Sequence, residues 1–339
     1  MPRLTQAIKN LTRLTSLSTR VLANSPFSGT AFVQRPPSYT VPAFSIPAGI
    51  AGYFAGGYSG GYLSGIDKIT FPADTKTTLS ATLTSGRNSF SGMANSGVAG
   101  YFGGGNDGTN ALSGIDKITF PADTKTTLSA TLTTINQDAA GMANSGEAGY
   151  FMGGLDGAAN LSGIDKITFP ADTKTTISAT LTTARRQGAG MANSGVAGYY
   201  GGGRDSARLS AIDKITFPAD TKTTLSATLT TAVSYLAAMA NSAVAGYFGG
   251  GSSSSVAVNT IDKITFPVDT KTTLSATLTA IRSSLAGMAN SAVAGYFGGG
   301  DPDTNIIDKV TFPADTKTTL SATLTASPTN LAAMANGGV

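Results

Sequence analysis

Residues 100–105 read GYFGGG, and residues 115–121 read IDKITFP. Both stretches recur in near-identical form along the chain, together with a third, Met-Ala-Asn, and each is present six times in the same order. The tyrosines that mark the first stretch lie 48 or 49 residues apart, at Tyr53, Tyr101, Tyr150, Tyr199, Tyr247 and Tyr296. Six copies of one unit indicate a repeat protein.

The composition favours strands and excludes several functional classes. Only 12% of the 339 residues are charged, 41% are hydrophobic, and Gly, Ala, Ser and Thr dominate the remainder, which is typical of a β-rich fold with a core. Residues 1–48 carry five basic and no acidic residues, so the repeats are close to neutral and lack the basic surface of a nucleic-acid-binding protein. No Cys or His is present. No run of 18 apolar residues exists, and no transmembrane segment is predicted.

The segment before the repeats, residues 1–48, is predicted to be a docking arm. Apolar residues at helical spacing predict an amphipathic helix within residues 1–24, and five prolines predict an extended linker over residues 25–48. A helix of this kind would pack on a partner; a transit peptide and a membrane-surface helix are the alternatives. The residues expected to contact the partner are Leu4, Ile8, Leu11, Leu14, Phe27, Phe32, Tyr39 and Phe44.

Each repeat is expected to form four short strands. In the second unit these are the strand that begins at Met93, the strand around Tyr101, residues 115–120, and residues 127–132, with a turn at residues 121–125. Four strands in about 48 residues is the size of one blade of a β-propeller. The small residues of the first two strands suit the crowded axis of such a ring. A β-solenoid is the structural alternative, with shorter repeats and no ring closure.

The offset of the repeats predicts a closed ring. The array begins in mid-unit at Ala51 and ends with an unmatched Met-Ala-Asn strand at Met334. The C-terminal strand would therefore complete the first blade and remove both open edges. The prediction is an all-β, six-bladed β-propeller over residues 49–339, closed by its C-terminal strand.

The diglycine after a hydrophobic strand, as at residues 102–104, and the aromatic-Pro-x-Asp-Thr turn resemble kelch repeats, and the likeness covers residues 51–339. Kelch repeats usually carry a Trp after this turn, and this chain has none. The near-identical units behind a separate arm are also similar to kelch-like tail-fibre and virion structural proteins of bacteriophages, cyanophages among them. This resemblance implies a virion protein with a role in host attachment.

Variation among the units is confined to two connections, which an antiparallel blade places on one face. The functional interpretation is a recognition face on a fixed scaffold, and the alternative is drift in exposed loops. Aromatic and arginine side chains are frequent anchors of interfaces. The candidate ligand contacts are Tyr58, Tyr62, Arg87, Asn88, Phe90, Arg185, Arg186, Arg204, Arg208, Tyr235 and Arg282.

The chain offers little for catalysis or for a metal site. Without His and Cys it lacks the commonest bases and nucleophiles. The repeated Asp-Lys step, as at Asp67 and Lys68, is expected to be structural because it is present in every unit, and the Asp of each turn, as at Asp74, is expected to form an Asx turn. Calcium at loop aspartates such as Asp107 is the metal alternative, but no EF-hand spacing exists. We therefore expect no cofactor and no catalytic residue.

The function predicted from these observations is a non-enzymatic virion appendage protein. The arm would attach it to other virion proteins, and the variable face would contact a host-surface receptor or glycan. A cellular protein–protein interaction scaffold and a polysaccharide-acting enzyme are the alternatives. The protein would form part of the extracellular particle, with homo-oligomerisation left open.

Overall fold

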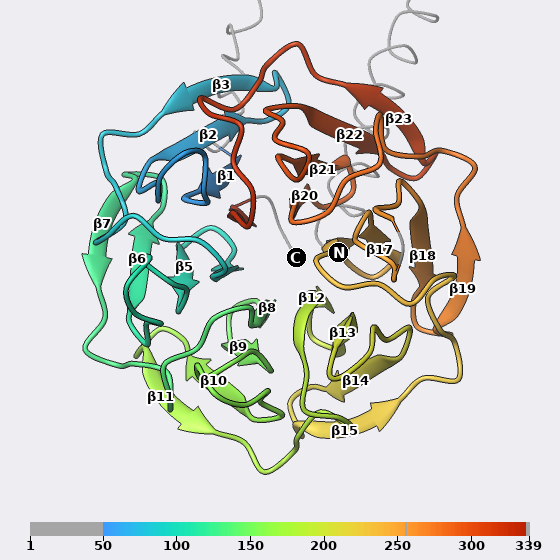
Figure 1. The fold of residues 1–339 in the computed structure, drawn as a ribbon, viewed down its shortest axis with the longest axis horizontal. Coiled ribbons are helices and arrows are strands. Elements are labelled where there is room, and N and C mark those ends of the chain that lie inside the picture. The colour runs from blue at the N-terminus through green and yellow to red at the C-terminus, as the bar shows by residue number, and fades with distance from the viewer. Residues whose placement is uncertain (1–49, 255, 337–339) are drawn as a thin grey trace, which may run out of the picture. The chain divides into compact units, whose positions relative to one another are not determined.

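The structure, a computed structural model, describes residues 50–254 and 256–336, so the predicted arm lies outside the described residues. The described chain is a β-propeller of six four-stranded antiparallel blades arranged in a ring (Figure 1). The second blade runs outward from the axis as β4 (Ser91–Asn95), β5 (Ala99–Gly103), β6 (Ile115–Thr119) and β7 (Thr124–Thr127). No helix long and apolar enough to span a bilayer is found among these residues.

The other five blades repeat this arrangement, and we number the blades in chain order from the one that contains β1. Blade 1 consists of β24 (Ala332–Ala335), β1 (Ala51–Ala55), β2 (Ile66–Thr70) and β3 (Thr75–Thr78). Blade 3 consists of β8 (Ala140–Asn144), β9 (Ala148–Met152), β10 (Ile164–Thr168) and β11 (Thr173–Thr176). Blade 4 consists of β12 (Arg186–Asn193), β13 (Ala197–Arg204), β14 (Ile212–Thr216) and β15 (Thr221–Thr224). Blade 5 consists of β16 (Ala237–Asn241), β17 (Ala245–Gly249), β18 (Ile261–Thr265) and β19 (Thr270–Thr273). Blade 6 consists of β20 (Ala286–Asn290), β21 (Ala294–Gly298), β22 (Ile307–Thr311) and β23 (Thr316–Thr319).

The prediction that the C-terminal strand completes the first blade is confirmed. β24 pairs antiparallel with β1, with Met334 opposite Tyr53. Its outer neighbours are β1, β2 and β3, so blade 1 takes one strand from the end of the chain and three from the start of the array. The innermost strands of all six blades contact one another around the axis, which closes the ring without an exposed edge there.

The predicted outer strand was wrong in position. It was expected at residues 127–132, but β7 occupies Thr124–Thr127, so it begins within the expected turn and overlaps the expected strand only at Thr127. The amide of Asp123 donates to the carbonyl of Thr119 at 2.8 Å, so the turn is tight and pairing resumes at Thr124. The alternating leucines that suggested a strand belong to the connection that crosses to the next blade, where Leu132 is buried.

Glycine and methionine fit together where neighbouring blades meet. A Cβ atom built on Gly100 of blade 2 would lie 1.8 Å from the sulfur of Met334 in blade 1, so only glycine leaves room for that side chain. The same pairing recurs at the other five junctions. The glycine before each tyrosine and the methionine of each Met-Ala-Asn therefore have one common cause, which is close approach of the inner strands.

A polar clasp also joins each pair of neighbouring blades. The hydroxyl of Tyr53 in blade 1 donates to Asp123 of blade 2 at 2.7 Å, and the ammonium group of Lys68 lies 2.6 Å from the other oxygen of the same carboxylate. The Tyr53 ring stacks on Phe120 with a centroid separation of 5.2 Å. The junction of blades 6 and 1 has the same clasp, in which Tyr296 and Lys309 contact Asp74. The remaining carboxylates are those of Asp172, Asp220, Asp269 and Asp315.

These contacts revise the interpretation of the repeated acidic residues. The turn aspartates, Asp74 among them, were expected to form Asx turns, but their side chains bind the tyrosine and lysine of the preceding blade. The Asp-Lys step is structural as expected, although its two members bind different partners. Asp67 accepts hydrogen bonds from Thr78 and from the backbone and side chain of Thr325, whereas Lys68 contacts the next blade.

Candidate functional site: the axial loop face

The connections that enter the innermost strands meet in a closed circle of hydrogen bonds around the axis, which we call the axial ring. One residue from each blade takes part, and each amide donates to the carbonyl of the residue in the preceding blade at 2.7–2.9 Å. All six residues adopt left-handed backbone conformations, with φ between 52° and 61°. The members are Ser89, Asp138, Gln187, Tyr235, Ser284 and Asn330. Residues other than glycine rarely adopt this conformation, and such strain is concentrated at functional sites.

The six side chains of the axial ring line one small pocket of about 70 Å³. They are chemically different in most blades, yet all of them are polar. Apolar side chains of the following positions, such as Phe90 and Leu236, complete its lining. A pocket of this size holds one functional group of a ligand, since pockets for whole small molecules are several times larger. The remainder of a ligand would lie on the surrounding loops.

Asp138 gives the axial ring its only carboxylate. Burial raises the pKa of Asp138 above its ordinary value, and hydrogen bonds from Gln187 and Ser89 and the charge of Arg186 oppose this rise only in part. The amide of Gln187 donates to Asp138 at 2.9 Å and to the hydroxyl of Tyr235 at 2.5 Å. The amide oxygen of Gln187 is buried and accepts no hydrogen bond within the described chain. Gln187 is one of the residues that line the pocket.

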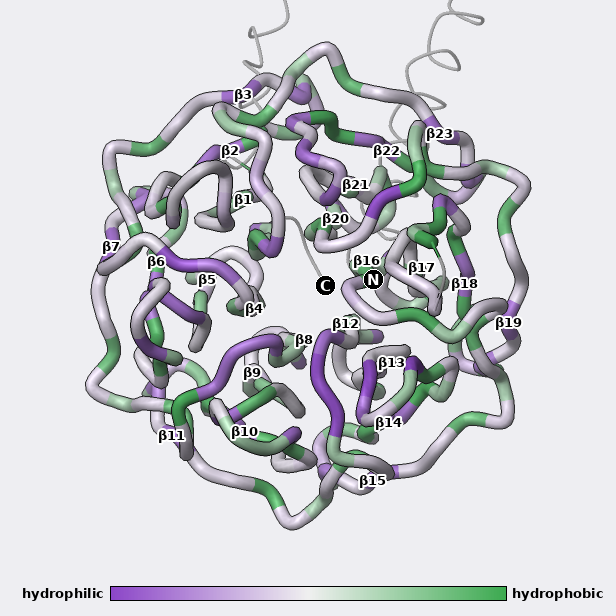
Figure 2. Tube along the Cα trace, viewed as in Figure 1, coloured by the Kyte–Doolittle hydropathy of each residue, from purple (hydrophilic) through white to green (hydrophobic). Residues whose placement is uncertain are grey.

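Three of the predicted contact arginines form a basic cluster on blade 4, which we call the arginine cluster. β12 and β13 are longer here than their counterparts in the other blades, which places Arg186 opposite Arg204. The backbone of Arg204 also pairs with that of Arg208 in an isolated antiparallel β-bridge. None of the three forms an ion pair with another described residue. The charges of Arg186 and Arg204 also act on Tyr235, although burial keeps the pKa of its hydroxyl raised. The arginine cluster thus lies beside the axial ring, and in Figure 2 the segment entering β12 is strongly hydrophilic.

The predicted aromatic contacts of blade 1 also lie together. They belong to the connection between β1 and β2, on the same face as the axial ring, which we call the loop face. Tyr58 and Tyr62 are 41% and 40% exposed, and their rings meet edge to face at 5.2 Å. Tyr62 extends over Gly108 of blade 2, where a Cβ atom would lie 2.4 Å from its ring. Blade 1 is opposite blade 4 in the ring (Figure 1), so the tyrosine pair and the arginine cluster flank the axial ring from two sides.

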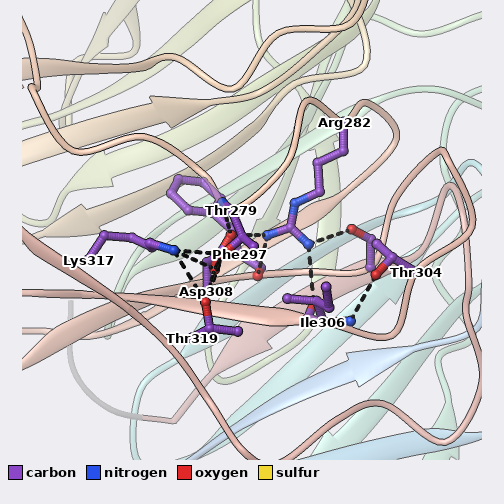
Figure 3. Close-up of polar contacts among 9 residues, drawn as sticks. Thr279, Arg282, Phe297, Thr304, Ile306, Asp308, Lys317 and Thr319 are labelled. Carbon is purple, nitrogen blue, oxygen red and sulfur yellow. Dashed lines mark hydrogen bonds and ion pairs between the residues drawn. The ribbon is translucent and has the colours of Figure 1, made fainter.

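Other predicted contacts are not on the surface. Arg87, Arg185 and Arg282 are 2%, 1% and 1% exposed, and Phe90 is buried with them. Each guanidinium group binds the aspartate of its own blade, for example Arg282 Nη2 and Asp308 Oδ2 at 2.8 Å (Figure 3). These arginines therefore stabilise blades and do not face a ligand, because the connection that carries them folds inward. Asn88 lies on the loop face, where its backbone bridges Asn106.

The pair of Arg282 and Asp308 gives a stability prediction. Asp308→Ala should lower the free energy of unfolding by about 3–5 kcal/mol, because it leaves a buried guanidinium without its anion. The matched control is Asp67→Ala in blade 1, which loses the corresponding threonine hydrogen bonds but has no arginine, and its loss should be smaller by about 1–2 kcal/mol. Urea denaturation at neutral pH measures both values.

A second substitution sharpens this test. Adding Arg282→Val to Asp308→Ala removes the unpaired charge and introduces the residue type that blade 5 has at the arginine position, Val233. We expect the double variant to recover part of the lost stability. Equal losses in the single Asp308 and Asp67 variants, or no recovery in the double variant, would contradict the assignment of a buried ion pair.

Sequence reasoning found only one member of the axial ring, Tyr235. The other five lie in the same variable connection, but the choice of candidates favoured aromatic and arginine side chains and passed over serine, aspartate, glutamine and asparagine. A scan against protein-family models finds no match, and a search of the curated proteins finds no significant match. Within the described chain no group of three or more acidic side chains is arranged to hold a metal ion. The site is therefore interpreted from its own geometry.

Proposed function

We propose that this protein is a non-enzymatic binding protein whose loop face contacts a carbohydrate on a cell surface. The observation that carries the proposal is the axial ring. Its six polar residues are of five types, serine, aspartate, glutamine, tyrosine and asparagine, and all of them line one pocket. Hydroxyl-rich ligands are recognised by such mixed donors and acceptors. The exposed Tyr58 and Tyr62 offer apolar ring faces to a sugar, and the arginine cluster offers donors to an acidic one.

The axial ring supports binding better than catalysis. Glycoside hydrolysis generally requires two carboxyl groups at a defined separation. Asp138 is the only carboxylate among the six ring side chains. We therefore place polysaccharide-acting enzymes below binding proteins as candidates.

The setting that we propose is a virus particle. The support is the resemblance of the repeats to kelch-like proteins of bacteriophage tails and fibres, together with the separate segment at residues 1–48. In this proposal that segment attaches the propeller to other virion proteins, and the loop face contacts the host.

A protein–protein interaction scaffold is the second candidate. One observation favours it: exposed valines occupy the same position on the opposite face in four blades, at Val98, Val196, Val244 and Val293. Glu147 holds this position in blade 3. An exposed set of apolar residues of this kind is typical of a protein-binding surface.

Binding of the full-length protein to purified bacterial surface polysaccharides tests the first candidate. The variants Asp138→Ser and Gln187→Ser introduce the residue that blades 2 and 6 already carry in the axial ring, so they should fold. We expect the double variant to bind at least about tenfold more weakly, which corresponds to about 1.4 kcal/mol. The control Glu147→Val copies the opposite face of four other blades and should bind as the unaltered protein does. Unchanged affinity in the double variant, or no binding to any polysaccharide, would contradict the proposal.

A further inference from the structure

Arginine occupies one buried position in every second blade. Arg87, Arg185 and Arg282 lie in blades 2, 4 and 6, each three residues after the threonine that binds the blade's aspartate. Blades 1, 3 and 5 carry Pro328, Asn136 and Val233 at this position. The aspartate is present in all six blades, so three of them have the acceptor without the arginine.

The three blades without arginine differ in how well the position is filled. In blade 3 the side-chain amide of Asn136 donates to the carbonyl of Gly153 at 2.8 Å. In blade 5 Val233 leaves a cavity of only about 10 Å³. In blade 1 Pro328 leaves a cavity of about 110 Å³, which we call the blade 1 cavity. About 10–15 Å³ holds one water molecule, so the blade 1 cavity has room for a group of several heavy atoms.

The blade 1 cavity retains the acceptors that hold an arginine in blade 6. The Arg282 guanidinium donates to Asp308 and to three backbone carbonyls, those of Phe297, Gly299 and Ile306 (Figure 3). The corresponding residues of blade 1 all line the cavity: Asp67, Phe54, Gly56 and Gly65. The carbonyl of Gly65 already accepts from Gly56, as that of Ile306 accepts from Gly299, so this bond does not exclude a second donor.

The remaining walls suit the aliphatic part of an arginine side chain. Leu63, Leu324 and Leu331 form an apolar sleeve, and the carboxylate of Asp67 lies among them. Lys76 lies 3.4 Å from Oδ1 of Asp67, as Lys317 lies 3.4 Å from Oδ1 of Asp308, whereas Arg282 binds Oδ2 of Asp308. The lysine therefore does not replace the arginine. Gly65 and Thr325 are exposed at the rim, so the cavity reaches the surface.

We propose that the blade 1 cavity is a binding site for an arginine side chain presented by a partner polypeptide. The planar guanidinium group has five donors in a fixed fork, which matches one carboxylate and three carbonyls, whereas a lysine ammonium group cannot reach acceptors spread in this way. The site shares only Leu331 with the axial pocket and does not depend on the proposed function.

The test uses the full-length protein and two small probes, N-acetyl-arginine amide and N-acetyl-lysine amide. A ligand that binds only the folded state raises the melting temperature, and above its dissociation constant the rise grows with the logarithm of its concentration. We expect this rise with the arginine probe, and the lysine probe should need at least about a tenfold higher concentration for the same rise.

Two variants locate the effect. Pro328→Val combined with Gly65→Thr copies Val233 and Thr260, two lining residues of the small blade 5 cavity, and should close most of the blade 1 cavity. Pro328→Arg copies blade 6 and should supply the guanidinium from within. The arginine probe should no longer raise the melting temperature of either variant. The proposal is overturned if both probes act equally, if the effect persists in the variant with both Gly65→Thr and Pro328→Val, or if the arginine probe does not raise the melting temperature of the unaltered protein.

Discussion

A chain that ends at Leu331, and so lacks β24, should fail to form a stable ring. β24 is the innermost strand of blade 1, and Ala332 and Met334 within it are each 3% exposed. Its removal uncovers the edge of β1 and the inner faces of blades 2 and 6, and it deletes a buried methionine whose loss alone costs about 2–5 kcal/mol. Together these losses are comparable to the whole net stability of a domain, about 5–15 kcal/mol. Circular dichroism melting should show no cooperative transition, and the truncated chain should aggregate.

A circular permutant provides the matched control. Joining Val339 directly to Ala51 gives the sequence MANGGVAGYF, which differs at one residue from residues 93–102, MANSGVAGYF. New ends between Thr109 and Asn110 fall in an exposed loop of blade 2. In this permutant blade 1 is formed by consecutive strands, and the new ends interrupt only the connection between β5 and β6 of blade 2. It should melt as cooperatively as the parent protein. A truncated chain that melts at the parent temperature would contradict the role assigned to β24.

The second large effect is expected at alkaline pH. Burial, and then the hydrogen bond and negative charge of the clasp aspartate, raise the pKa of each clasp tyrosine, as for Tyr53 with Asp123, well above the ordinary 10.0. The same shift applies to Tyr101, Tyr150, Tyr199, Tyr247 and Tyr296. The unfolded chain releases these protons above about pH 10 while the folded ring retains them, so the free energy of unfolding falls as the pH rises.

The size of this effect follows from the number of clasps. Each tyrosine contributes about 1.4 kcal/mol per pH unit, and six contribute about 8 kcal/mol per pH unit. We expect the absorbance of tyrosinate from these residues to appear together with the loss of the β-sheet circular dichroism signal, in one steep transition. Tyr296→Phe should reduce the slope by about one sixth. Ionisation of the clasp tyrosines in a ring that keeps its β-sheet signal would contradict the prediction.

The fold was accessible from the sequence because one unit is repeated six times. The spacing of the tyrosines gave the number of blades, and the unmatched strand at Met334 gave the closure, which pairing of β24 with β1 confirms. The outer strand was misplaced because the alternation at residues 128–132 resembles a strand, although tight turn closure at Asp123 moves the pairing toward the N-terminus. The spacing of apolar residues alone does not show where such a turn closes.

The candidate site was only partly predictable. Exposure of Tyr58 and Tyr62 agrees with their assignment to the loop face, but Arg87, Arg185 and Arg282 were assigned there from residue type, which does not reveal burial. Their partners, such as Asp116, stand 26 to 29 residues away in sequence, and only the folded blade brings the charges together. The axial ring depends on convergence of six distant segments, which the sequence of one unit does not contain.

The clasps have a consequence for the evolution of this molecule. Because the tyrosine, lysine, aspartate and phenylalanine contacts are the same at all six junctions, the clasp itself does not restrict which unit follows which. Exchange of units by recombination would therefore change the residues that face the axis and keep every clasp. Whole units can thus supply new combinations of binding residues around the axis while the clasps that join them stay the same.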